Sequence, residues 1–477
     1  MQADDILDQA AIEVEPVPPE GAQAQGQSLW KKACSLHLEN KFEEAEKLYT
    51  QLLEQNHENT GLMATLGSLY VQTKRFGLAI HFLESAIAKG LKQHDAFTNL
   101  ALAYTQCHMR DKARHYFEKS IEEEATPEAL TNYSAMFIEA GESKKCAALC
   151  EQAIAENPNL PLAHWNLALS LLGDGVWERA WDEHEWGLKG NFMREDRVVL
   201  DVPIWDGTKG KTVLVYGEQG LGDEIMFASM LPDLLATNKV VFECHKKLGT
   251  LFRKSFPEIP VYGTREDRVV DWAENHPIDY RLCIGSLGKF YRRSREAFPG
   301  TAYLSADPLP KEGFRVGISW KGGGAKLGRV AKRSVPLSWW KPILNIPGIE
   351  FVSLQYGLGK EQDLDMADAL GYNIKRMDEY ADSDDYYETA RLVKSCDLII
   401  SVCTSLVHLS GALGVPCWVL TPRYPAWRYQ NQGPMPWYRS VRLYRSPSVE
   451  REAWYPVLDR IGYDLERLVS TDKQKVA

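Results

Sequence analysis

The chain has 477 residues, of which 44% are hydrophobic and 25% charged, and its formal net charge is −10. This length allows several domains of roughly 100–200 residues, and the acidic balance argues against nonspecific nucleic-acid binding, which needs a basic surface. The apolar runs are shorter than the ~20 residues that cross a bilayer, and the first residues do not have the pattern of a secretory signal. The nine cysteines form no C-x-x-C pair, so we expect no zinc site. We therefore expect a cytoplasmic multidomain protein.

The first segment, residues 1–27, is acidic and then rich in Pro, Gly and Gln. Residues 1–28 hold six acids and no Lys or Arg, so the rest of the chain carries a net charge of only −4. The apolar content of residues 1–27 is too low to offset the entropy of ordering, so we expect this segment to be a disordered acidic tail.

A repeat follows, which we assign to residues 28–190. Small residues recur with spacings of 34, 34, 33 and 34, and a second small residue comes twelve positions after each of them. The first set is Ala33, Gly67, Ala101, Ser134 and Ala168; the second is Ala45, Ala79, Ala113, Cys146 and Ala180. This pattern resembles the tetratricopeptide repeat (TPR) family, in which two amphipathic helices cross at small residues. The resemblance implies a five-repeat superhelix whose groove binds a protein or peptide segment.

Beyond a linker at 191–210, short β-rich runs alternate with helical stretches. We expect strands at Thr212–Tyr216, Val240–Cys244, Val316–Trp320, Phe351–Gln355, Leu398–Val402 and Cys417–Leu420. Strands that alternate with helices indicate parallel sheets. Asp307-Pro-Leu-Pro310 divides this region into two α/β lobes, 211–310 and 311–477.

Three segments at strand ends are candidates for ligand binding, because ligands bind at the carboxyl ends of parallel strands. The first is the glycine-rich turn Gly217-Glu-Gln-Gly220-Leu-Gly222-Asp223. Its glycines let backbone N–H groups approach a ligand, and the helix start favours an anion. The turn is neither a dinucleotide fingerprint nor a P-loop. A tight strand–helix connection with Asp223 as a helix cap explains it equally well.

The second segment joins Ser319-Trp320-Lys321 to a triple glycine and then to Lys332 and Arg333. Between Lys311 and Lys341 there are eight Lys or Arg and one acid. Such a basic loop suits a diphosphate, whose charge it neutralises, although a solvated basic loop has the same composition.

The third segment runs from a strand into a helix that begins near Thr404 or Ser405, either of which can cap it. First-turn N–H groups would then be available to an anion. His408 lies one turn inside this helix, on the face of Thr404 and Ser405. A lone helical histidine is more often structural, so the role of His408 stays open.

Residues 416–460 add seven Arg and three acids among many aromatic residues. Arg and aromatics together suit a nucleotide base and its phosphates or a single strand of nucleic acid, and packing between lobes is the alternative. We interpret the acidic clusters at Asp365-x-x-Asp368 and Asp382-x-Asp384-Asp385 as solvated loop or helix-cap acids, and we predict no metal site.

Taken together, these motifs resemble the heptosyltransferase-like glycosyltransferases of the GT-B superfamily that are joined to TPR arrays in bacteria, with O-GlcNAc transferases as more distant relatives. The motifs that match the family, in order, are Pro203-x-Trp205-Asp206-Gly207, Glu218-Gln-Gly-Leu-Gly-Asp223, Ser319-Trp320 with Arg333-Ser-x-Pro336-Leu337, Phe351-x-Ser-Leu-Gln355, Thr404–Pro416, Trp427-Arg428-Tyr429 and Pro436-Trp437-Tyr438. The resemblance implies an α + α/β chain: a TPR superhelix followed by a GT-B-like pair of Rossmann-like lobes. It implies an inverting, metal-independent transferase that uses a nucleotide-diphosphate sugar as co-substrate and needs no cofactor.

The resemblance also implies the site residues. Asp223 would be the general base, and the donor and acceptor would be bound by Gly220, Gly222, Ser319, Lys321, Lys332, Arg333, Gln355, Thr404, Ser405 and His408. The chain departs from the family at Cys403, where relatives have Asp before the Thr. A thiol cannot orient donor hydroxyls as a carboxylate would.

Three functions remain open. The leading hypothesis is a glycosyltransferase that modifies a protein docked by the TPR groove, for which we infer a surface or flagellar subunit from the family alone. The second is a TPR scaffold whose glycosyltransferase domain is inactive, with Cys403 as the mark of that loss. The third is a transferase that acts on a glycan or a lipid-linked sugar, with the repeats serving oligomerisation.

Overall fold

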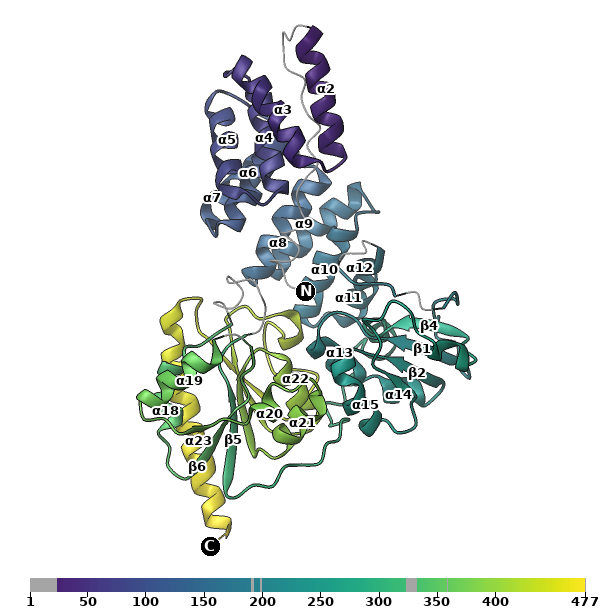
Figure 1. The fold of residues 1–477 in the computed structure, drawn as a ribbon, viewed down its shortest axis with the longest axis vertical. Helices are drawn as coiled ribbons and strands as arrows, with labels where there is room; N and C mark the ends of the chain where they lie inside the picture. Colours follow the sequence, from purple (N-terminus) through teal and green to yellow (C-terminus); the bar gives the residue numbers. More distant parts are fainter. Residues whose placement is uncertain (1–23, 190–192, 198–199, 323–332, 358, 477) are drawn as a thin grey trace. The chain divides into compact units, whose positions relative to one another are not determined.

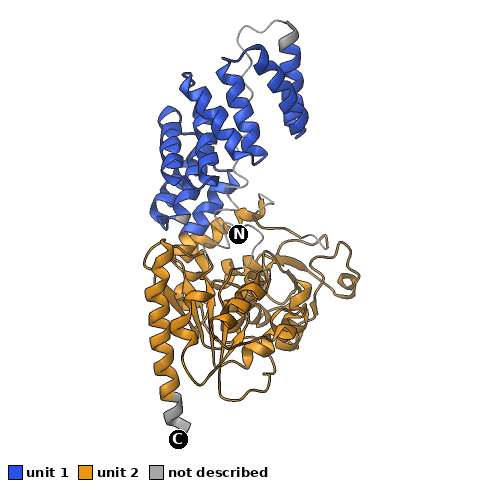
Figure 2. Cartoon of the chain, turned by 60° about the vertical axis from the view of Figure 1, so that its left-hand side comes forward, with its two compact units in different colours: residues 1–170 blue, residues 171–477 orange. Residues whose placement is uncertain are grey.

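The computed structural model describes residues 24–189, 193–197, 200–322, 333–357 and 359–476. The chain divides into two compact units, residues 1–170 and 171–477 (Figures 1 and 2). Most of the expected acidic tail, part of the expected linker and Lys332 lie outside the described residues. The expected domain boundaries at 190 and 310 stay predictions.

The first unit is a succession of helix pairs, as the 34-residue period predicts. The pairs are α2 (Ala24–Leu38) and α3 (Phe42–Gln55), α4 (Thr60–Gln72) and α5 (Phe76–Ala88), α6 (His94–Gln106) and α7 (Arg110–Glu123), and α8 (Pro127–Glu139) and α9 (Ser143–Glu156). A further pair, α10 (Pro161–Asp174) and α11 (Trp177–His184), spans the boundary between the units, and α12 (Trp186–Lys189) follows it.

The small residues of the repeat lie where helices cross. All ten of them are buried, and a Cβ added to Gly67 would lie 2.5 Å from Cγ of Leu83 on the partner helix. Polar side chains join successive repeats: the Asn99 amide donates to Ser68 Oγ at 3.0 Å, and the Asn166 amide donates to Ser134 Oγ at 3.0 Å. The expected helical repeats are therefore confirmed.

The second unit contains two parallel sheets. The first is built from β1 (Thr212–Tyr216), β2 (Lys239–Glu243), β3 (Val261–Tyr262) and β4 (Tyr280–Cys283), in the order β3-β2-β1-β4. Its helices are α13 (Leu221–Ala228), α14 (Leu231–Leu235), α15 (Gly249–Ser255) and α16 (Leu287–Tyr291). Trp181 of α11 is buried against this region: a Cβ on Gly288 would lie 2.6 Å from its ring, and its indole N–H donates to the Arg292 carbonyl at 2.8 Å.

The second sheet has six strands in the order β10-β9-β8-β5-β6-β7. They are β5 (Phe314–Ser319), β6 (Ile349–Ser353), β7 (Ile374–Lys375), β8 (Leu398–Val402), β9 (Cys417–Thr421) and β10 (Val441–Arg445). Numbered along the chain, this order is 3-2-1-4-5-6, the order of doubly wound sheets that bind nucleotides where it reverses. In this sheet the reversal falls between β5 and β8, where Ser319 pairs in register with Ser401.

Helices surround the second sheet: α18 (Lys341–Leu344), α19 (Lys360–Ala369), α20 (Asp378–Ala381), α21 (Tyr386–Lys394), α22 (Ser405–Ala412) and α23 (Trp454–Val476). One core includes Val316 and Ile318 of β5, the buried indoles of Trp320 and Trp340, and Leu458 of α23. Within the described part of the chain, no helix has both the length and the apolarity that a membrane crossing requires.

Candidate functional site

The glycine-rich turn runs from the end of β1 into α13, with Gly220 as the residue before the helix. The Asp223 carboxylate lies in the first turn of α13 and accepts the Gly220 backbone N–H through Oδ2 at 3.3 Å. The turn is narrow, because a Cβ on Gly217 would lie 2.5 Å from the Glu224 carboxyl carbon. Gln219 adopts a left-handed backbone with φ of 59°. The turn therefore holds Asp223 at the carboxyl end of β1.

The capped helix expected near Thr404 is α22. Thr404 precedes it, and its Oγ1 accepts the Leu406 N–H at 3.3 Å. The Ser405 hydroxyl lies 2.8 Å from the Tyr386 hydroxyl, and Nδ1 of the buried His408 lies 3.3 Å from the Tyr438 hydroxyl. All three residues expected here thus lie together at the start of α22.

The starts of α13 and α22 lie against one another (Figure 1). A Cβ on Gly222 would lie 3.2 Å from Cα of Ser405 and 3.2 Å from Cδ2 of His408. Gly222 is required here for close approach rather than for an unusual backbone angle. The structure therefore brings the first and third predicted segments together, although they belong to different sheets.

Asp223 forms an ion pair with Arg428, which comes from the 3₁₀ turn Trp427–Tyr429. The Arg428 Nη2 atom donates to Asp223 Oδ1, while Oδ2 faces Gly220, so both carboxylate oxygens have a donor. The side chains of Asp223 and Arg428 are only 14% and 10% exposed, so water screens the pair weakly. The sequence placed Arg428 in an aromatic motif but did not single it out as a partner of Asp223.

Burial and charge together set the protonation of the site. Burial alone would raise the pKa of Asp223, but the Arg428 guanidinium and His408 hold it below its ordinary value. Burial, with the Arg428 charge, lowers the pKa of His408 to about 3 against the opposing influence of Asp223. At neutral pH Asp223 is therefore a carboxylate and His408 a neutral imidazole.

Ser319, Lys321 and Gln355 lie at the ends of β5 and β6. Gln355 Oε1 accepts the Ser319 hydroxyl at 3.1 Å and the Lys321 N–H at 2.8 Å. Its Nε2 donates to the carbonyls of Lys321 and Tyr356 at 3.3 and 2.9 Å. Gln355 is thus bound to the backbone at the end of β5, and Lys321 Nζ forms a 2.5 Å ion pair with Asp363 of α19.

Arg333 lies near the end of β8. Its charge lowers the pKa values of Cys403, Tyr356 and Tyr429, against the larger effect of burial, which raises each of them. A Cβ on Gly322 would lie 2.9 Å from Cβ of Arg333, so the basic segment returns to the end of β5. Lys332, the neighbouring candidate, lies outside the described residues.

Cys403 is buried directly before Thr404. Its thiol lies 3.8 Å from the Leu420 carbonyl, and burial raises its pKa to about 11 although Arg333, Arg428 and Arg445 act in the opposite direction. The thiol is therefore protonated and uncharged at neutral pH. It supplies no negative charge at the position where the resemblance leads one to expect a carboxylate.

A buried ionic network supports the start of the glycine-rich turn, and the sequence analysis named Glu218 in a motif but not its partners. Arg194, whose side chain is 0% exposed, donates to both oxygens of Glu218, with Nε–Oε2 and Nη2–Oε1 distances of 2.9 Å. Ser286 Oγ accepts a further N–H of Arg194 at 2.9 Å, and the Gly285 N–H donates to Glu218 at 2.9 Å. Glu218 thus anchors the turn to the segment that follows β4 and to Arg194, which precedes β1.

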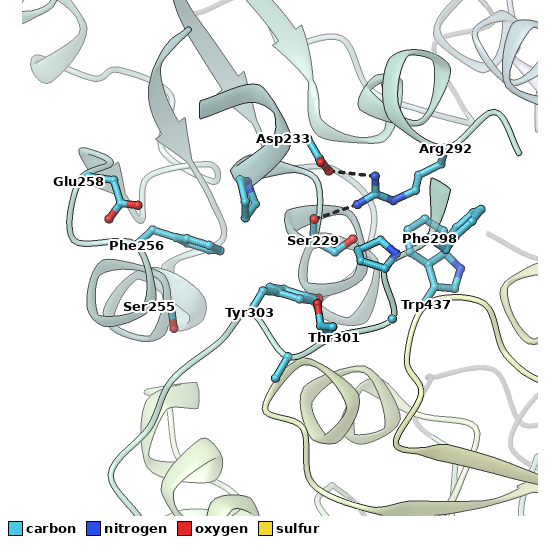
Figure 3. Close-up of a pocket in the computed structure, with 14 residues that line it drawn as sticks. Ser229, Asp233, Ser255, Phe256, Glu258, Arg292, Phe298, Thr301, Tyr303 and Trp437 are labelled. Atoms are coloured by element: carbon cyan, nitrogen blue, oxygen red, sulfur yellow. Dashed lines mark hydrogen bonds and ion pairs between the residues drawn. The ribbon is translucent and has the colours of Figure 1, made fainter. Parts of the chain in front are cut away.

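A pocket of about 360 Å³ lies at the other end of α13 (Figure 3). Arg292 forms a 2.9 Å ion pair with Asp233 at its edge and donates to the Ser229 carbonyl at 3.0 Å. Aromatic residues, including Tyr303 and Trp437, also line it, and none of the site residues named from the sequence does. The Tyr303 hydroxyl lies 3.3 Å from that of Tyr438, the residue that contacts His408. The pocket and the candidate site are therefore joined by polar side chains.

The acidic clusters are paired with basic side chains. Arg376 binds Asp365 and Asp368 at 2.8 and 2.9 Å, and Lys360 binds Asp382 at 3.0 Å. Among the residues that the structure describes, no three His, Cys, Asp or Glu side chains gather as a metal site would require.

Comparison with known proteins identifies the repeats and one long relative. The tetratricopeptide repeat family model matches residues 94–126. Protein FlbA of Caulobacter vibrioides is 28% identical over 420 residues, which cover 80% of this chain and 69% of FlbA. Among solved structures, MamA matches with a TM-score of 0.30 and 18% identity over 33% of this chain and 92% of MamA. YrrB, described as a TPR protein with an unusual peptide-binding site, matches with a TM-score of 0.27 and 17% identity over 36% of this chain and 88% of YrrB. The family match shows that the chain contains tetratricopeptide repeats, an architecture that binds peptide and protein partners.

Proposed function

We propose that the second unit is a glycosyltransferase that moves a sugar from a nucleoside-diphosphate donor to an acceptor hydroxyl. One observation carries this proposal: the Asp223 carboxylate and the capped start of α22 lie together, at the carboxyl ends of strands from two parallel sheets. A base beside an anion-binding helix start is what such a transfer needs.

In the proposed reaction, Asp223 accepts the proton of the acceptor hydroxyl as its oxygen forms a bond to the anomeric carbon. The bond between that carbon and the diphosphate oxygen breaks, and its electron pair leaves with the nucleoside diphosphate. First-turn N–H groups of α22 and the charge of Arg333 stabilise the leaving group, with Lys321 and Lys332 as further candidates. A single displacement of this kind inverts the anomeric centre, and it requires no step through a metal ion.

We also propose that the acceptor is a protein docked by the repeats. The support for this step is the confirmed repeat array, since such arrays present extended surfaces to peptide segments. A variant that lacks α2–α9 keeps α11, whose Trp181 is buried in the second unit. We expect it to hydrolyse donor but to modify no protein. Unimpaired modification would instead favour a glycan or lipid-linked acceptor.

An inactive scaffold is the second candidate, and two observations favour it. Cys403 is an uncharged thiol at the position where the resemblance leads one to expect a carboxylate, and Asp223 is engaged by Arg428. The two candidates differ in a direct assay. The full chain is incubated with a panel of nucleotide sugars, and release of nucleoside diphosphate is followed by mass spectrometry. Release above an uncatalysed control from at least one donor supports the enzyme, and release from none of them supports the scaffold.

A further inference from the structure

Arg428 and Asp223 hold each other in a geometry that conflicts with proton transfer. Both oxygens of Asp223 face N–H donors, one from Arg428 and one from Gly220. A carboxylate held in this way accepts a proton poorly, since a general base works best when its pKa lies near the working pH. If Asp223 is the base, Arg428 has to change partner during the reaction.

The backbone that carries Arg428 is fixed on both sides. Before it, Trp427 stacks on Phe227 with ring centroids 6.4 Å apart. After it, Gln430 has a left-handed φ of 59° and donates to the Leu172 carbonyl at 2.7 Å, and the Asn431 N–H donates to the Gly173 carbonyl at 2.9 Å. A change of partner is therefore a rotation of the Arg428 side chain and not a movement of its loop.

The Arg428 guanidinium lies where an anion at the start of α22 would attract it. Its charge acts on Cys403 and on His408, which lie on either side of the first turn of that helix. Its Nε atom is buried and, among the described residues, has no hydrogen-bond partner. Arg428 thus has a donor that its pairing with Asp223 leaves unused. The planar fork of an arginine suits phosphate oxygens as well as a carboxylate.

We propose that Arg428 exchanges partners: it binds Asp223 in the unliganded protein and turns to the diphosphate once that group occupies the start of α22. Donor binding would then free Asp223 to accept a proton, so the base would become active only when a donor is present. This inference rests on the proposed function. It assigns to Arg428 a role in coupling donor binding to the chemistry.

The test is calorimetric binding of inorganic pyrophosphate to the full chain in metal-free buffer. Because neutralising Asp223 releases the Arg428 guanidinium for the anion, we expect Asp223→Asn to bind pyrophosphate about tenfold more tightly than the unmodified chain. We expect Arg428→Gln to bind it about tenfold more weakly, and Arg428→Lys to lie between these variants.

Glu224→Gln is the matched control. Glu224 is the next residue of α13 and is paired with Arg265 instead of Arg428. The measurements are made at pH 8.5, above its raised pKa of about 7, so Glu224→Gln removes a nearby charge without releasing Arg428. We expect its affinity for pyrophosphate to stay within about twofold of the unmodified chain. Three results would each overturn the exchange. They are equally tighter pyrophosphate binding by Glu224→Gln and Asp223→Asn, no tighter binding by Asp223→Asn, and no pyrophosphate binding by any variant. The comparison of the two carboxyl variants holds even if Arg428→Gln fails to fold.

This experiment can fail separately from the proposed function. If Asp223→Asn binds pyrophosphate more tightly but the unmodified chain turns over no nucleotide sugar, the exchange is upheld and the transferase is contradicted. If the unmodified chain turns over a nucleotide sugar but Asp223→Asn binds pyrophosphate no more tightly, the transferase is upheld and the exchange is contradicted.

Discussion

Gly222 lies so close to Ser405 that a Cβ on it would stand 3.2 Å from the Ser405 Cα atom. This contact joins the glycine-rich turn after β1 to the helix after β8. It explains why the motif has glycine directly before Asp223, a point that a tight turn alone did not require. Because Ser405 contributes backbone here, the contact cannot relax by rotating a side chain.

Gly222→Ala should therefore destabilise the second unit by about 1–3 kcal/mol, the usual cost of an added methyl in a tight contact. Urea unfolding followed by tryptophan fluorescence measures this, because Trp30 and Trp165 alone of the 14 tryptophans lie in the first unit. Gly220→Ala is the control: a Cβ there meets only Asp223 Oδ2 at 3.4 Å, and little change is expected. Equal stability of the two variants would show that the contact is not tight in solution.

The buried pair of Arg194 and Glu218 makes a second prediction. Arg194→Met leaves the Glu218 carboxylate buried without its main partner, which typically costs about 3–5 kcal/mol. The double variant Arg194→Met with Glu218→Gln should recover part of this loss, because no uncompensated charge remains. The same urea experiment checks it. A double variant whose loss equals the sum of the single losses would mean that the two side chains do not interact.

Glu224 makes a prediction about pH. Burial, opposed by Arg265, raises the pKa of its carboxyl to about 7. A folded-state pKa above the unfolded value means that the native protein binds the proton more tightly. The contribution to stability is complete below about pH 4.5 and is lost as pH rises through 7. The stability that is lost over this pH range is about 3 kcal/mol in total.

Unfolding of the unmodified chain and of Glu224→Gln at pH 5 and pH 8 measures this contribution. The free energy of unfolding of the unmodified chain, relative to that of the glutamine variant, should be lower at pH 8 than at pH 5. An unchanged difference between the two pH values would show that Glu224 has an ordinary pKa.

Cys403 offers a test of the proposed glycosyltransferase site. Arg333, Arg428 and Arg445 all act on this buried position, so a carboxylate there would meet three positive charges. We expect Cys403→Asp to fold and to raise donor turnover. Cys417→Asp is the matched control, because Cys417 is also buried and no arginine acts on its thiol among the causes of its raised pKa. This variant should lose several kcal/mol of stability. Equal destabilisation of both variants would contradict the arginine-rich environment.

Much of the fold follows from local pattern. The expected strands Thr212–Tyr216 and Leu398–Val402 have the bounds seen in β1 and β8, and the other four differ by one or two residues. The strands that were missed have weaker local signals. Each of β3 and β7 has only two residues, and each of β4 and β10 carries arginine within a short run. Their pairing comes from the neighbouring strand and not from their own sequence.

The sequence predicted the separate segments of the candidate site but not the contacts between residues that lie far apart along the chain. Backbone requirements made the glycine-rich turn and the Thr404 cap visible, since each depends on residues close in sequence. The partner of Asp223 was not, because Arg428 lies 205 residues away. The Arg194–Glu218 pair was also missed, because Glu218 belongs to the glycine-rich motif but Arg194 belongs to no recognised pattern.

The most direct measurement of the central claim is the rate at which nucleoside diphosphate is released from the preferred nucleotide sugar by the full chain and by Asp223→Asn. Loss of a general base should lower this rate about 100-fold or more, while calorimetry shows that the variant still binds the nucleoside diphosphate. Equal rates for the two proteins would contradict Asp223 as the base. The absence of release by the unmodified chain from every donor would contradict the glycosyltransferase itself.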